Sequence, residues 1–186
     1  MPWLPLQTPR LVLRRFGQGD LAAFQAYRSD PELARYQAWR PVPDADALRF
    51  LRQQASATLG ARGAWLQVAL TRRDDGALIG DLGLCVRDER LGAVEVGFTL
   101  ARAAQRQGLA SEAVRAVLEV LFAGGHARSA IAVADARNQA SLALLERVGF
   151  QRVRTVETLI RNEACLELTY ALSAAHRSPG SPATEK

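Results

Sequence analysis

A short polar run followed by small residues forms a candidate anion site in this sequence. It reads Gln105-Arg106-Gln107-Gly108-Leu109-Ala110, and it leads into a stretch with helical spacing of apolar residues. The first turn of a helix has unpaired N–H groups and a partial positive charge, which together suit phosphate or pyrophosphate. Gly108 and Ala110 leave those N–H groups uncovered, and Arg102 and Arg106 add positive charge nearby. Taken alone, the glycine spacing is a weak signal and is more typical of a helix that simply starts in a tight turn.

The elements around this run indicate how it is positioned. A helix is predicted over Ala110–Phe122, with an apolar stripe at Ala110, Ala113, Val114, Val117, Leu118 and Leu121. Three strand-like runs joined by short turns precede it, at Ala64–Leu70, Ala77–Val86 and Ala93–Leu100, and short turns imply antiparallel neighbours. A strand at Ser129–Ala136 and a helix at Gln139–Val148 follow. The order strand, helix, strand predicts a parallel pair between Ala93–Leu100 and Ser129–Ala136.

The two ends of the chain complete a mixed, mostly antiparallel α/β sheet with helices on its faces. Leu6–Phe16 is predicted as one strand, followed by a helix with Asp20 as its N-cap that Pro31 breaks and restarts. A further helix is predicted from a cap near Asp44 to Gly60. The runs Gln151–Ile160 and Cys165–Leu172 are typical of two antiparallel strands. We therefore expect a single domain over residues 1–172 and a disordered tail over 173–186.

Composition narrows the class of protein. The chain has 186 residues, 48% of them hydrophobic, and contains no long apolar stretch or signal peptide, so we expect no membrane partner. Cys85 and Cys165 lie in apolar runs and are interpreted as reduced core residues of a cytoplasmic protein, although a disulfide between them is possible. His126 and His176 have no metal-ligand spacing with them, so no metal is expected. The net charge of +5 and the pI of about 10 leave nucleic-acid binding as an alternative, which the dispersed arginines and the few aromatic residues disfavour.

Four motifs in order resemble the GNAT acetyltransferase family. The run from Gln105 to Ala110 is similar to the family's acyl-CoA loop, Gln/Arg-x-x-Gly-x-Gly/Ala, between a strand and a helix. The segments LQTPRLVLRRF, SDPELARY and ARNQASLALLERVGF resemble the branch that contains the ribosomal-protein N-terminal (Rim-type) acetyltransferases. The resemblance spans about Leu6 to Leu172. It implies a GNAT-type sheet with one splayed parallel strand pair, and direct transfer of acetyl from acetyl-CoA to a primary amine.

The resemblance also implies a set of residues that bind the cofactor. Backbone N–H groups at the start of the helix would hold the pyrophosphate, and the strand that ends at Leu100 would pair with the pantetheine arm. A backbone N–H of Gly97 or Phe98 would polarise the thioester carbonyl. Asn138 would contact the pantetheine, or act as a helix N-cap, or both. The complete set is Val96, Gly97, Phe98, Thr99, Leu100, Arg102, Gln105, Arg106, Gln107, Gly108, Leu109, Ala110, Ser111, Asn138 and Ser141.

Attack by an amine needs a proton acceptor, because amines are mostly protonated at neutral pH. The resemblance implies that Glu95 accepts this proton through water; the alternative is a solvent-facing glutamate without a role. Glu112 and Glu157 are weaker candidates for the base. Family members often protonate the leaving thiolate with a tyrosine where this chain has Leu145. The resemblance to the Rim-type branch suggests Ser141 as a substitute acid; the alternatives are that Ser141 merely faces the CoA sulfur and that solvent supplies the proton.

The acceptor remains the least defined partner. Tyr36, Trp39 and Arg40 are predicted to form its wall, or else to pack in the core. Glu163 and Glu167 would attract a cationic amine, or lie on a solvated strand face. The acceptor would be a protein N-terminus or a small amine, and the protein would be a monomer or a homodimer. A non-catalytic acyl-CoA sensor or partner-binding module on the same fold remains the alternative function.

Overall fold

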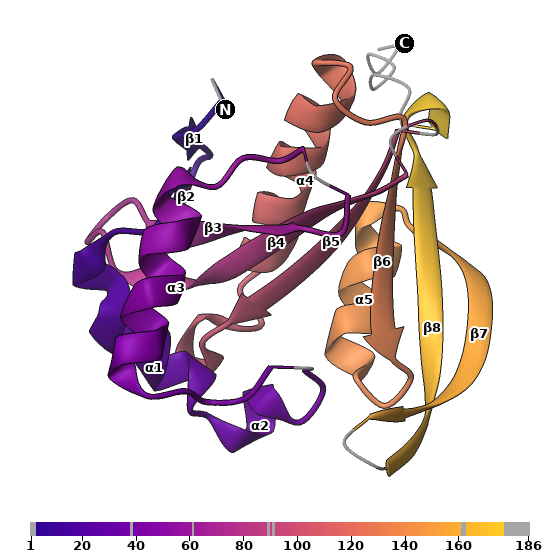
Figure 1. Ribbon diagram of the computed structural model, residues 1–186. Helices are drawn as coiled ribbons and strands as arrows, with labels where there is room; N and C mark the ends of the chain where they lie inside the picture. The colour runs from indigo at the N-terminus through magenta and orange to yellow at the C-terminus, as the bar shows by residue number, and fades with distance from the viewer. Residues whose placement is uncertain are drawn as a thin grey trace, which may run out of the picture.

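One sheet provides the frame on which the candidate residues are arranged. Over the described residues (3–37, 39–60, 62–88, 90, 92–160 and 163–176), a computed structural model shows eight strands in the order β1-β2-β3-β4-β5-β6-β8-β7 (Figure 1). The strands are β1 (Leu6–Gln7), β2 (Leu11–Arg14), β3 (Trp65–Arg72), β4 (Leu78–Asp88), β5 (Ala93–Leu100), β6 (Ser129–Asp135), β7 (Gln151–Ile160) and β8 (Glu163–Ser173). The α-helices are α1 (Leu21–Arg28), α2 (Pro31–Ala34), α3 (Asp44–Ser56), α4 (Leu109–Ala123) and α5 (Gln139–Val148). Short 3-10 turns occupy Gln18–Asp20, Arg102–Ala104 and Ala174–His176.

The strands β5 and β6 form the predicted parallel pair, and the other neighbouring strands are antiparallel. The parallel pairing covers Ala93–Glu95 opposite Ser129–Ile131 and then stops. Beyond Glu95 the two strands diverge, because β6 continues to pair with β8 as far as Asp135 and follows it away from β5 (Figure 1). The mixed, mostly antiparallel sheet with one splayed parallel pair is thus confirmed.

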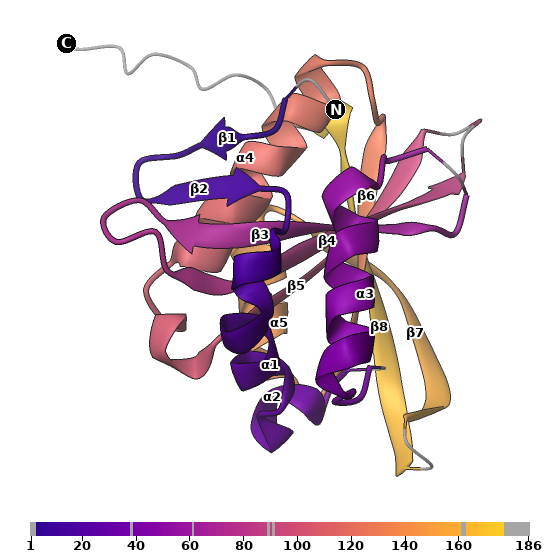
Figure 2. The ribbon, with the colours of Figure 1, turned by 60° about the vertical axis from the view of Figure 1, so that its left-hand side comes forward.

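Helices cover both faces of the sheet (Figure 2). On one face, Phe24 of α1 and Leu51 of α3 form a small core with Ala69 of β3. On the other face, α4 and α5 pack on a larger core that includes Val94 and Val96 of β5. Alternation along β5 therefore directs Glu95 to the face of α1 and α3, opposite its two buried valine neighbours, as predicted.

The prediction of one strand over Leu6–Phe16 is wrong, because this segment forms a two-strand hairpin, β1 and β2. The Thr8 N–H donates to the Leu11 carbonyl at 2.9 Å, and Thr8 Oγ1 accepts from the Leu11 N–H at 3.0 Å. Pro9 follows and has no N–H with which to extend a strand ladder. These two features turn the chain back on itself.

The two predicted helix starts lie where expected, but no side chain caps either helix. Asp20 occupies the N-cap position of α1, but its carboxylate accepts hydrogen bonds from the Gly17 N–H and the Arg14 guanidinium instead of from helix amides. Asp44 is the first residue of α3, after Pro43 at the N-cap position, and the helix ends at Ser56, before Gly60. Asp20 is bound by Arg14 and therefore does not cap α1, and Pro43 has no side-chain group with which to cap α3.

Other predictions concern the cysteines, the membrane and the tail. Cys85 and Cys165 are both free and buried, as predicted. No helix of the described chain has the length and the apolar character that crossing a membrane requires. The strand β8 extends to Ser173, and the last 3-10 turn reaches His176. The rest of the predicted tail, residues 177–186, lies outside the described residues.

Candidate active site

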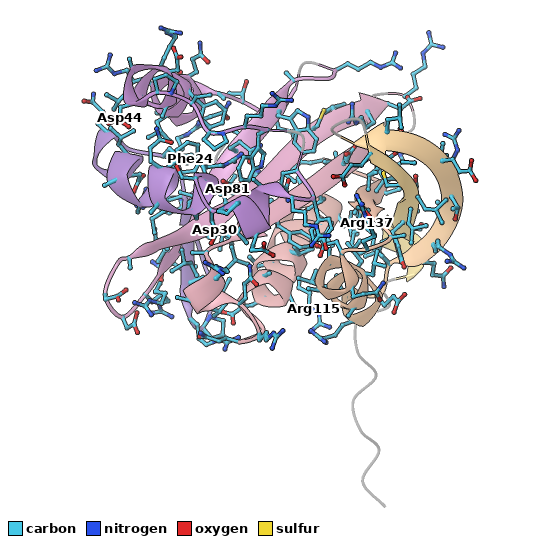
Figure 3. The ribbon with its side chains drawn as sticks, turned by 90° about the horizontal axis from the view of Figure 1, so that it is seen from below. Phe24, Asp30, Asp44, Asp81, Arg115 and Arg137 are labelled. Carbon is cyan, nitrogen blue, oxygen red and sulfur yellow. The ribbon has the colours of Figure 1, made fainter. Side chains whose placement is uncertain are left out.

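A cleft of about 790 Å³ lies where β5 and β6 diverge, and both faces of the sheet contribute to its walls. Residues of α2 and the segment after it line one side, and the first turns of α4 and α5 line the other. Figure 3, seen from this end, shows Phe24, Asp30 and Asp81 in the N-terminal half and Arg137 in the C-terminal half. The divergence of the strands therefore opens a passage between the two faces, where two reactants can meet.

The structure brings most of the predicted site residues into this cleft. The predicted residues that line it are Tyr36, Phe98, Thr99, Leu100, Arg102, Gln105, Arg106, Gly108, Leu109, Ala110, Ser111, Asn138 and Ser141. The predicted residues that do not line it are Trp39, Arg40, Glu95, Val96, Gly97 and Gln107. Gln107 instead borders a separate hollow of about 500 Å³ beside Arg10.

The first turn of α4 has the features of an anion site. Gly108 holds the N-cap position in the left-handed conformation (φ 76°), and no side chain caps the helix amides. Ser111 is 5% exposed, and its Oγ is buried without a hydrogen-bond partner among the described residues. Arg102, Arg106 and Arg147 line the same cleft, so its charge favours an anion. An uncapped helix start, an unpaired buried hydroxyl and three arginines fit a diphosphate.

The loop before α4 is held by a contact that the sequence did not reveal. The Arg10 guanidinium donates to the Gln107 carbonyl at 2.8 Å and to Glu112 Oε2 at 2.7 Å. The Thr8 hydroxyl and the Arg10 N–H donate to Glu112 Oε1 at 2.6 and 2.9 Å. Burial raises the pKa of Glu112, but these hydrogen bonds outweigh it and place the pKa below its ordinary value. Glu112 therefore stabilises the loop through Arg10. Both of its carboxylate oxygens already accept hydrogen bonds, which does not suit a catalytic base.

Glu112→Gln is expected to lower the free energy of unfolding by about 1 to 2 kcal/mol near neutral pH, because the charge-assisted bonds are lost. Since the folded-state pKa of Glu112 is depressed, its contribution is complete above the ordinary value of 4.5 and is lost as the pH falls through the lower folded value. Thermal melts of both proteins between pH 3 and pH 7 (roughly the range in which carboxylates titrate) test this. The two melting temperatures should converge towards acid, and a constant difference would contradict the assignment.

Other polar side chains around the loop also have local partners. Arg102 Nε pairs with Asp30 Oδ2 at 2.6 Å, and Asp30 Oδ1 caps α2 by accepting from the Glu32 N–H. Gln105 Nε2 donates to the Leu100 carbonyl at 3.0 Å. These contacts join the loop before α4 to β5 and to α2, which bears the opposite wall of the cleft.

Glu95 is the last residue of β5 that pairs with β6, so it lies where the gap between the strands begins. Its carboxylate accepts a hydrogen bond from Arg87 Nε, and this bond raises the pKa of Arg87. The Arg87 guanidinium lies 5.7 Å from the centre of the Trp65 ring. Trp65 in turn lies against Gly97, which neighbours the gap. Sequence reasoning identified Glu95 but missed Arg87 and Trp65, because they belong to other strands.

Residues of α5 supply the remaining polar groups near the gap. Asn138 Oδ1 accepts from the Ser141 N–H at 3.2 Å, so Asn138 caps α5 while it also lines the cleft. Ser141 is half-buried and lines the cleft one turn further on. Leu145 is 1% exposed within the core that lies under α4 and α5. No tyrosine hydroxyl is therefore available at position 145.

The three residues predicted to form the acceptor wall do not lie together. Tyr36 lines the cleft and Arg40 is exposed, whereas the Trp39 ring lies 4.4 Å from the Arg28 guanidinium carbon. Arg28 is buried and pairs with the buried Asp81 at 2.8 Å. Desolvation and the nearby charge of Asp81 raise the pKa of Tyr27, whose hydroxyl donates to the same carboxylate at 2.5 Å. Trp39 therefore packs on a buried network that fixes α1 to the sheet.

Acidic residues of the last hairpin have mostly local roles. Glu163 pairs with Arg137 at 3.2 Å, and Arg137 also binds Asp135 at 2.6 Å. Glu157 is exposed on β7, and Glu167 is half-buried opposite Asp135. In the part of the chain that the structure describes, no three acidic, histidine or cysteine residues are grouped to hold a metal ion.

Comparison with known proteins identifies relatives at the level of sequence and of fold. A family profile described as an acetyltransferase (GNAT) domain matches residues 10–151. The uncharacterized N-acetyltransferase p20 of Bacillus licheniformis is 29% identical over 147 residues, which are 79% of this chain and 82% of p20. A GNAT-family acetyltransferase from Bacillus anthracis has a TM-score of 0.80 at 22% identity, covering 91% of this chain and 98% of that one. RimL, a ribosomal alpha-N-protein acetyltransferase solved with coenzyme A, has a TM-score of 0.76 at 16% identity, covering 89% and 95%.

The profile covers the chain from the turn before β2 to the start of β7. That segment contains the splayed strand pair and both helices whose first turns line the cleft. The solved structures share the same fold over about nine-tenths of this chain. The chain therefore belongs to the GNAT family and is an acetyl-CoA-dependent acetyltransferase.

Proposed function

We propose that this enzyme transfers the acetyl group of acetyl-CoA directly to a primary amine, either a protein N-terminus or a small amine. The observation that carries the proposal is the uncapped, arginine-flanked first turn of α4 in the cleft. Backbone N–H groups from Gln107 to Ser111 would donate to the diphosphate of the cofactor. The Ser111 hydroxyl would donate to a phosphate oxygen, which would satisfy a buried group that has no partner among the described residues.

The divergence of β5 from β6 supports the position of the acyl end. Beyond Glu95 the edge of β5 has no pairing with β6. The main chain of Val96, Gly97, Phe98, Thr99 and Leu100 is thereby available to pair with the pantetheine amides as a strand would. Asn138 and Ser141 line the opposite wall. An N–H of Gly97 or Phe98 would polarise the thioester carbonyl, which is an oxyanion-hole role.

Two proton transfers accompany the reaction, one from the acceptor ammonium and one to the leaving thiolate. Glu95 would accept one proton of the acceptor ammonium through water, so that the neutral nitrogen can attack the carbonyl carbon. The N–C bond forms while the C–S bond breaks, and the second amine proton leaves the nitrogen. Ser141 or solvent would deliver a proton to the thiolate, since Leu145 has no acidic group. The products are an N-acetyl amide, CoA thiol and one released proton.

The test of this proposal includes a non-catalytic acyl-CoA sensor as an outcome, because Leu145, which is buried, stands at the family's tyrosine position. Release of free thiol from acetyl-CoA over a panel of small amines and N-terminal peptides separates the two. Turnover on at least one acceptor is the expected result. Calorimetric binding of acetyl-CoA without turnover on any acceptor would support the sensor. Absence of binding would remove both proposals.

The setting of the reaction is part of the proposal. RimL acts on a ribosomal protein. For this reason the panel of acceptors in the thiol-release test contains peptides with free N-termini as well as small amines. A cytoplasmic location and a monomeric or homodimeric state follow from the sequence-based expectations. Sedimentation of the purified chain distinguishes the two assembly states.

A further inference from the structure

We propose that the acceptor carries a carboxylate next to its amine, as an α-amino acid does, and that Arg87 binds this carboxylate. The inference rests on the transfer reaction proposed above, in which Glu95 accepts one proton of the acceptor ammonium. It concerns three neighbouring residues, Trp65, Arg87 and Glu95, which we refer to as the Trp65–Arg87–Glu95 cluster.

The cluster is assembled from three adjacent strands on the face of α1 and α3. Trp65 of β3 is opposite Cys85 of β4, which is opposite Glu95 of β5. A β-bulge between Val86 and Asp88 interrupts the register where Arg87 is located. Bulges commonly re-aim a side chain. Here the Arg87 Nε donates to the Glu95 carboxylate across the strand pair.

Exposure within the cluster decreases towards the carboxylate. The side chains of Arg87 and Glu95 are 43% and 12% exposed, and Trp65 is 36% exposed. The outer end of the cluster is thus an arginine and an aromatic ring open to solvent, and the inner end is a largely buried carboxylate. A ligand that approaches from solvent meets the cation first and the anion second.

Glycines make room for the aromatic wall beside the gap. A Cβ at Gly83 would come within 2.9 Å of the Trp65 ring, and a Cβ at Gly97 within 3.6 Å. Neither glycine has a positive φ, so backbone conformation does not require glycine at these positions. The absence of a side chain at position 83 makes room for the Trp65 ring, which lies within van der Waals distance of position 97 on β5, next to the region proposed for the thioester.

The opposite charges of Arg87 and Glu95 favour an acceptor that carries both an ammonium and a carboxylate. An acceptor that carries only an ammonium competes with Arg87 for the Glu95 carboxylate and offers the guanidinium no anion in exchange. An acceptor that also carries a carboxylate exchanges partners, because its ammonium takes Glu95 and its carboxylate takes Arg87. A guanidinium binds a carboxylate with two parallel hydrogen bonds, which also fixes the orientation of the amine. The single Arg87–Glu95 ion pair of the free protein is thereby replaced by two ion pairs with the acceptor.

The test compares L-amino acids with their amides in pairs that differ only at the carboxylate. The value of kcat/KM is measured by thiol release for the wild type, Arg87→Met, and the control Arg90→Met, which removes an exposed arginine from the same β4–β5 connection. Wild type and Arg90→Met should favour the acid over the amide at least roughly tenfold. Arg87→Met should bring the ratio to within about threefold of unity. Since the amine of the amide is less basic and a larger fraction of it is neutral near neutral pH, an acid preference cannot arise from the supply of neutral amine.

Calorimetry in the presence of CoA, with the same amino acids as probes, separates recognition from turnover. If no acceptor is acetylated but amino acids bind tightly only when Arg87 is present, the proposed reaction fails and the recognition site stands. If turnover is observed with equal use of acids and amides, and Arg87→Met leaves that ratio unchanged, the reaction stands and the inference is overturned. Absence of both turnover and binding for every amino acid also overturns it. Circular dichroism melts establish that each variant is folded.

Discussion

Replacing Ala110 by Asp is expected to weaken acetyl-CoA binding at least about 100-fold while the protein stays folded. Ala110 is the second residue of α4 and lines the cleft. A carboxylate at this position would face the same N–H groups that we assign to the diphosphate. Like charges placed together in a complex cost several kcal/mol, whereas an acidic residue in the first turn of a helix stabilises the helix. Folding and cofactor binding are therefore expected to respond in opposite directions.

Ala110→Asn is the matched control, because it has nearly the same shape as the aspartate and no charge. Its affinity for acetyl-CoA should fall much less than that of Ala110→Asp. Calorimetry at low and moderate salt measures both, and the difference between them should shrink as salt screens the charges. Equal affinities for the two variants would show that the diphosphate does not bind at the start of α4. Thermal melts are expected to place Ala110→Asp no lower than Ala110→Asn.

Local patterns in the sequence sufficed to predict the frame of the site. The bounds of β5 and α5 were predicted residue for residue, because alternating and helical apolar spacing are clear at Ala93–Leu100 and Gln139–Val148. The parallel pair followed from the order of elements alone, since a strand, a helix and another strand return the chain in the same direction. The run from Gln105 to Ala110 was informative because anion binding by a helix start depends on local backbone geometry.

Contacts between distant segments could not be predicted in this way. Arg10 and Glu112 are 102 residues apart and meet because the β1–β2 hairpin folds back towards the start of α4. The sequence predicts one strand in place of this hairpin. A single strand would not bring Arg10 to the loop before α4. Arg87 lies beside Glu95 because of the pairing register of β4 and β5 and a β-bulge between Val86 and Asp88. No local sequence pattern predicts this bulge. The supporting residues of the site were therefore less predictable than the residues that they support.

Glu95→Gln is expected to lower kcat by about 10²- to 10⁴-fold at neutral pH, with the affinity for acetyl-CoA nearly unchanged. The amide is similar in size to the carboxylate but cannot accept the proton of the ammonium. Arg87, which is partly exposed, loses an anionic partner without being buried alone, so we expect the variant to fold. Steady-state kinetics on the best acceptor of the panel, with acetyl-CoA binding measured separately, provide the readout.

The pH dependence of Glu95→Gln distinguishes a lost base from a general disturbance of the site. Raising the pH increases the fraction of neutral acceptor amine in bulk solution, so the variant should regain activity until the amine itself has titrated. A merely misfolded or misaligned site would lose the same factor at every pH. Glu157→Gln on β7 is the matched control, since it removes an exposed carboxylate from a strand that does not border the gap. If Glu95→Gln turned over like the wild type while Glu157→Gln lost activity, the proton acceptor would have to be assigned to the last hairpin instead.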